Sequence, residues 1–125
     1  MEGINQKIIV AVDNLENEIM VLKKSLHFNM VANDTTHNAA ETGAMFSFHS
    51  LFLQIIGYWI GLLDSNLTIK PNLPAKEQAT FNKITTQIKN IASYNADSKP
   101  ILYAMLFKYS QQHPFDLGEK NNKSE

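Results

Sequence analysis

Residues 42–63 read TGAMFSFHSLFLQIIGYWIGLL, an uncharged run between Glu41 and Asp64. We expect this run to form one long helix, since no stretch of the chain alternates over more than a few residues as a strand would. On a helix, large apolar residues fill two of its stripes, and small or uncharged polar residues fill the third. The residues of this third stripe repeat at spacings of four and three, and they are Thr36, Ala40, Gly43, Ser47, Ser50, Gln54, Gly57 and Gly61.

The third stripe has three interpretations. It faces water in a helix that is central to its own bundle, it is covered by a partner such as a second copy, or the whole helix enters a membrane. The run has about the 20 residues that a span requires, but the polar side chains of Ser47, His49, Ser50 and Gln54 oppose insertion. Glycine inside a helix costs about 1 kcal/mol relative to alanine, so several on one face indicate a packing role. We therefore predict an interface at Gly43, Ser47, Ser50, Gln54, Gly57 and Gly61.

The flanking sequence predicts three more helices. Residues 4–32 carry a helical apolar seam, while Lys23, Lys24 and other charged residues lie off the seam and are expected to be solvated. The third helix is expected to begin near Pro74, with its pattern broken from Asn95, and the fourth to begin near Pro100 and to stop at His113; the first turn of a helix accepts a proline. The expected core positions of the first, third and fourth helices are Ile8, Val12, Leu15, Ile19, Leu22, Leu26, Phe81, Ile84, Ile88, Ile91, Ile101, Leu102, Met105, Leu106 and Tyr109.

These segments predict an all-α fold. We expect an up-down-up-down four-helix bundle with two long N-terminal helices and two shorter C-terminal helices. Polar or proline-containing connections separate the four segments, and no repeat or second domain is visible. The expected domain covers residues 1–114, and residues 115–125 form a polar tail that we expect to be disordered.

Composition narrows the class of protein. The 125 residues contain no cysteine, which excludes disulfides and thiolate metal sites, and no arginine, which argues against specific nucleic-acid recognition. The first 64 residues hold three lysines and seven acids, whereas the remainder holds eight lysines and five acids. The lysines of the second half predict a solvated basic face, with polyanion binding as an alternative. We expect a cytoplasmic protein, and the lysine, asparagine and isoleucine content indicates an AT-rich genome, bacterial or phage.

Histidines and acids give one candidate metal site. Asp34, His37 and Glu41 share one helix face if the second helix begins early, and His27 approaches them across an antiparallel hairpin. The competing interpretation is helix capping and ordinary surface polarity. By the same counting, His27 and His49 lie too far apart in depth to share a site.

The pattern therefore favours a non-enzymatic protein–protein interaction module, such as an adaptor, small chaperone, immunity-type protein or inhibitor. We expect it to self-associate as a homodimer through the second helix, with no cofactor. The alternatives are a bundle that binds a metal or small ligand, and a membrane-associated helical protein. No phosphate-binding glycine loop or metalloprotease motif supports an enzyme.

Overall fold

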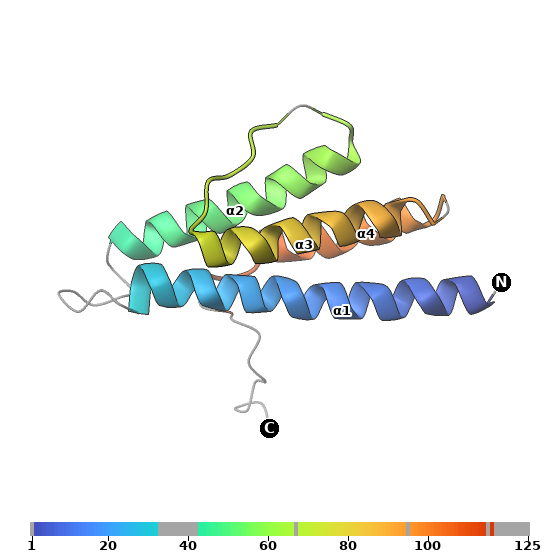
Figure 1. Ribbon diagram of the computed structural model, residues 1–125, viewed down its shortest axis with the longest axis horizontal. Helices are drawn as coiled ribbons and strands as arrows, with labels where there is room; N and C mark the ends of the chain where they lie inside the picture. The colour runs from blue at the N-terminus through green and yellow to red at the C-terminus, as the bar shows by residue number, and fades with distance from the viewer. Residues whose placement is uncertain (1, 33–42, 67, 95, 115, 117–125) are drawn as a thin grey trace, which may run out of the picture.

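The computed structural model describes residues 2–32, 43–66, 68–94, 96–114 and 116 (Figure 1). Its helices are α1 (Glu2–His27), followed by the short π-helix η1 (Phe28–Ala32), then α2 (Gly43–Leu63), α3 (Ala75–Ala92) and α4 (Ser98–Ser110). The described residues include no strand. The prediction of an all-helical chain with four helices is confirmed.

The directions of the helices differ from the predicted up-down-up-down order. α2 runs opposite to α1, and α3 then runs in the same direction as α2, while α4 returns in the direction of α1 (Figure 1). Contacts along the bundle agree with this order, because Trp59 of α2 stacks on Phe81 near the start of α3, and Leu63 and Ile88 further along line one pocket. The bundle is therefore up-down-down-up.

The connection between α2 and α3 explains the difference. The eleven residues from Asp64 to Pro74 span up to about 36 Å when extended, which is enough to return alongside α2 rather than to make a tight hairpin. Ser65, with a φ of 61°, ends α2, and the amide of the next residue, Asn66, bonds the carbonyl of Gly61. The segment then runs back past α2 to the start of α3 (Figure 1).

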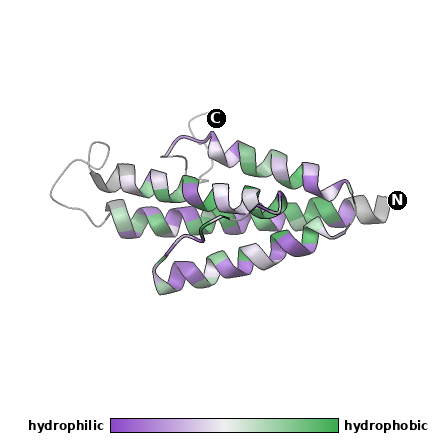
Figure 2. Ribbon diagram, turned by 90° about the horizontal axis from the view of Figure 1, so that it is seen from above, coloured by the Kyte–Doolittle hydropathy of each residue, from purple (hydrophilic) through white to green (hydrophobic). Residues whose placement is uncertain are grey.

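One hydrophobic core joins the four helices. Every seam residue predicted for the first and third helices is buried, and so are Phe48, Phe52, Ile55 and Trp59 on the large apolar stripe of α2. Ile101 was predicted to be in the core but is 39% exposed on α4. Figure 2 shows the hydrophobic residues distributed over all four helices, with hydrophilic residues prominent along α3.

Candidate functional site

The small-residue stripe of α2 is open over most of its described length. Ser47, Ser50, Gln54 and Gly57 are exposed, on the side of the helix opposite Phe52 and Trp59 of the core. Gly43 is the first residue of α2. We call Ser47, Ser50, Gln54 and Gly57 the open face of α2. It carries no charge, so another surface can approach it without desolvating an ion.

The two interior glycines of this stripe differ. A Cβ atom added at Gly57 would have no neighbour within 4 Å, so nothing in the described part of the chain requires a glycine there. A Cβ added at Gly61 would lie 2.5 Å from Cγ2 of Thr68 in the returning connection. Gly61 is buried because it admits this connection, whereas Gly57 is exposed.

Aromatic side chains of α4 lie next to α2. The Tyr103 hydroxyl donates a hydrogen bond to the carboxylate of Asp64, just after the end of α2. The Tyr103 ring also stacks on Phe107 with a centroid distance of 6.2 Å, and Phe107 is 51% exposed. An apolar contact surface is therefore available on the helix that packs against α2.

The predicted metal set falls mostly outside the described residues. Asp34, His37 and Glu41 lie in the undescribed residues 33–42, and only His27 can be placed. Its ring packs edge-on against Phe48, with a centroid distance of 5.2 Å. No group of three histidine or acidic side chains gathers to hold a metal within the described ranges.

The position of His27 corrects the expected register between the first two helices. Phe48 directly precedes His49, and Lys23 influences both His27 and His49 electrostatically. His27 therefore lies level with Phe48, one residue before His49, although helical counting placed His27 and His49 far apart in depth. The counting assumed a turn at residues 33–35 with the second helix starting directly afterwards, and the contact between His27 and Phe48 does not fit that register.

Lys23 was expected in solvent but is fully buried, and this is the largest error among the sequence predictions. Its Nζ atom donates to Oε1 of Gln112 at 2.9 Å, to the carbonyl oxygen of His113 at 3.2 Å and to that of Asp116 at 2.7 Å. The position is four residues after Ile19 and three before Leu26, so it borders the apolar seam. That spacing is the signal in the sequence that could have identified a buried site.

Burial affects the titration of this region. It lowers the pKa of Lys23 from 10.5 to about 8, against the opposing effect of Asp116. Burial is also the main reason that the pKa of His49 is lowered, with further contributions from Lys23 and His113. Among the described residues, no hydrogen-bond partner reaches the buried Nδ1 atom of His49.

A second buried charged residue, Glu77, lies in the first turn of α3 and is 1% exposed. Its Oε2 atom accepts hydrogen bonds from the hydroxyl of Ser25 and from Nδ2 of Asn29 at 2.9 Å, both of which follow Lys23 in the chain. The N-terminal turn of a helix favours a carboxylate, so Glu77 has a structural role in joining α3 to α1.

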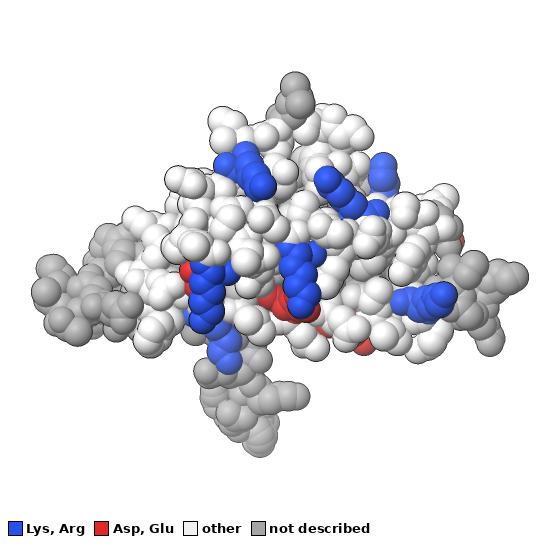
Figure 3. Space-filling view, viewed as in Figure 1, with Lys and Arg blue, Asp and Glu red and all other residues white. Residues whose placement is uncertain are grey.

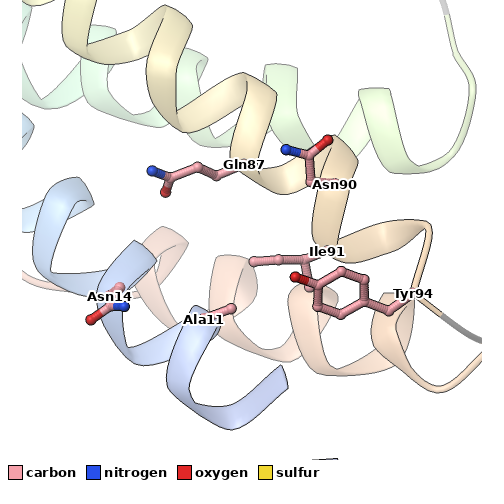
Figure 4. Close-up of a pocket in the computed structure, with 6 residues that line it drawn as sticks. All are labelled: Ala11, Asn14, Gln87, Asn90, Ile91 and Tyr94. Carbon is pink, nitrogen blue, oxygen red and sulfur yellow. The ribbon is translucent and has the colours of Figure 1, made fainter. Parts of the chain in front are cut away.

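A shallow pocket of about 180 Å³ lies between α1 and α3 (Figure 4). α1 contributes two of its residues, and α3 with the turn after it contributes the rest. The lining residues are Ala11, Asn14, Gln87, Asn90, Ile91 and Tyr94. Their side chains are carboxamides, a phenol and aliphatic groups, so the pocket offers hydrogen bonds to a neutral ligand but no charge.

Lysines are spread across the face of the molecule seen in Figure 3, on which acidic side chains are few. Lys83 on α3 forms an ion pair with Glu18 of α1 at 3.3 Å. An exposed pair of this kind contributes little to stability, and a dispersed lysine surface is typical of a solvated face.

Comparisons with protein-family models, curated proteins and solved structures gave no match. Within the described residues, no helix has both the length and the apolar character needed to cross a membrane.

Proposed function

We propose that this chain is a non-enzymatic helical interaction module that self-associates through the open face of α2. The main support is the exposure of Ser47, Ser50, Gln54 and Gly57 on a helix that has no formal charge along its length. A monomeric bundle normally gives the outer face of a helix charged residues, as it does on α3. Here that outer face is small and neutral, which suits close helix–helix contact.

The open space at Gly57 indicates where two copies of α2 would cross. Helices approach most closely where a residue lacks a side chain, so two copies of α2 can cross at Gly57, with Gln54 and Ser50 in the two preceding turns of the same face. In a twofold arrangement each copy presents the same residues to the other. Phe107, exposed on the adjacent α4, supplies apolar area that a partner covers.

The test is the solution mass of the purified chain as a function of concentration, measured by sedimentation equilibrium. We expect a dimer at roughly 100 µM, where an association free energy of about 5 kcal/mol leaves half of the protein associated. Gln54→Glu adds a charge without changing the size of the side chain, and it should raise the dissociation constant at least about tenfold.

The matched control is Gln111→Glu, which adds the same charge at an exposed position just after α4. It should leave the dissociation constant unchanged, and circular dichroism should show equal helicity in all three proteins. A wild-type chain that stays monomeric throughout this concentration range would refute self-association. Equal weakening by both substitutions would place the contact elsewhere.

A further inference from the structure

The groove between α1 and α3 has a register that one ion pair defines. The two helices run in opposite directions, and Lys83 of α3 pairs with Glu18 of α1 at 3.3 Å. Because the helices are antiparallel, four residues back along α1 and four residues forward along α3 bring Asn14 opposite Gln87. The pocket of about 180 Å³ begins at this turn.

The pocket has a polar end and an apolar end. The carboxamides of Asn14 and Gln87 lie toward one end, whereas Ile91 and Tyr94 lie toward the other, with Ala11 below them (Figure 4). Ile91 is buried, so this part of the floor belongs to the core. Tyr94 is 47% exposed, so its ring has a face that a flat ligand can cover.

The polar side chains of the pocket are not used within the fold. Among the described residues, no protein group bonds the polar side chains that line it, which are Asn14, Gln87, Asn90 and Tyr94. Elsewhere on α3 such groups are paired, since Gln78 donates to Asn82 at 3.2 Å and Thr85 donates to the Phe81 carbonyl at 2.8 Å. Three carboxamides in one pocket therefore offer donors and acceptors that a ligand can use.

The carboxamides define the chemistry that fits the polar end. Each presents an N–H donor beside a C=O acceptor, and its complement is a lactam edge, in which a ring C=O lies beside a ring N–H. Such edges form two parallel hydrogen bonds, as asparagine and glutamine do with base edges in nucleic acids. No residue that lines the pocket is charged, so the lining provides no counter-ion for a phosphate or carboxylate.

The volume of the pocket limits the size of the ligand. An apolar cavity of about 150 Å³ holds a benzene ring. The pocket of about 180 Å³ therefore accommodates one six-membered ring with its small substituents.

We propose that this pocket binds a neutral six-membered heterocycle with a lactam edge, the chemical class to which the pyrimidine base uracil belongs. The ring lies over Ile91 and against Tyr94, and its lactam edge pairs with the half-buried carboxamide of Gln87. Asn14, across the groove, bonds the remaining ring carbonyl. This inference does not depend on self-association, because the pocket lies between α1 and α3 and the open face belongs to α2.

A titration of the full chain with uracil tests the proposal. The side-chain amide signals of Asn14 and Gln87, followed by NMR up to about 10 mM ligand, should shift and saturate with a dissociation constant of about 1 mM. The amide signals of the open face of α2 should stay unchanged. Pocket signals that do not move, or that move without saturating, would overturn the proposal.

Two related ligands test the chemistry. In 1,3-dimethyluracil both ring N–H groups carry methyl groups, so it should bind about tenfold more weakly than uracil. Uridine keeps the lactam edge, and uridine monophosphate should bind no more tightly than uridine, because the lining supplies no cation. Equal binding of the dimethyl compound, or tighter binding of the nucleotide, would contradict recognition of a neutral lactam.

Two substitutions test the position of the ring. Gln87→Met keeps the length of the side chain but removes its hydrogen-bonding groups, and it should weaken uracil binding up to about tenfold. Tyr94→Leu removes the stacking surface and should weaken binding at least about fivefold. The control Gln111→Met, at an exposed position after α4, should bind as the wild type does, with equal helicity by circular dichroism. Wild-type affinity in Gln87→Met or in Tyr94→Leu would show that the ring does not lie there, and the proposal would fail.

Discussion

At the scale of single residues, Lys23 shows how burial can outweigh charge. Three acceptors and an aromatic ring bind its ammonium, yet its pKa falls to about 8 because the cost of removing the ion from water exceeds what these groups return. The folded chain therefore binds this proton less tightly than the unfolded chain, in which the pKa is 10.5.

This difference predicts how stability depends on pH. Between pH 8 and pH 10 the unfolded state holds more protons, so the free energy of unfolding should rise with pH, by at most about 1.4 kcal/mol per unit. Lys23→Met should remove the rise, as measured by urea denaturation across the window. Burial raises the pKa of Tyr109, which lowers stability only above its ordinary pKa of 10.0 and leaves this window clear. A rise that is equally steep in Lys23→Met would contradict the assignment to this lysine.

At the scale of elements, the sequence predicted where helices form more successfully than how they are connected. The apolar period located α1 and α3 and their buried residues, because burying one stripe of a helix requires that spacing whatever the neighbours are. The direction of α3 depends on the path of residues 64–74, and their composition is compatible with a hairpin or with a crossover. Lys23 escaped prediction for a similar reason, since its acceptors come from a segment about 90 residues away.

The candidate interface likewise has one feature that the local sequence pattern predicts and another that depends on tertiary contact. The stripe of small residues could be read from its spacing, and the structure leaves Ser47, Ser50 and Gln54 exposed. The separate role of Gly61 could not be read, because it arises from contact with Thr68 in the crossover connection. Contact with Thr68, rather than local pattern, distinguishes Gly61 from Gly57.

The two glycines provide a matched pair of substitutions. Gly57→Ala should stabilise the dilute monomer by about 1 kcal/mol, because alanine favours helix and the new Cβ meets no neighbour. Gly61→Ala should be destabilising despite the same gain in propensity, because its Cβ would require Thr68 to move. Chemical denaturation of both variants at low concentration checks this order, and equal stability would show that Thr68 yields without cost.

At the scale of the whole molecule, charge and neutral surface occupy different regions. Lysines dominate the face shown in Figure 3, while the open face of α2 has no charge. Self-association through α2 should therefore depend little on ionic strength, whereas contact between a lysine surface and the acids of another copy should weaken as salt screens it. Sedimentation equilibrium at low and high salt distinguishes the two, and a dissociation constant that rises steeply with salt would argue against the α2 interface.

The hydrogen bonds of Lys23 to the residues after α4 also have a consequence for the order of folding. Lys23 and its three acceptors are 89 to 93 residues apart in the chain, whereas α3 and α4 are joined by a turn of five residues. Contacts between distant residues bear the largest loop-closure entropy, so the α3–α4 hairpin can assemble early and the hydrogen bonds of Lys23 form late. These bonds join the residues just after α4 to the first helix. A contact of this kind is also well placed to open before the rest of the molecule unfolds.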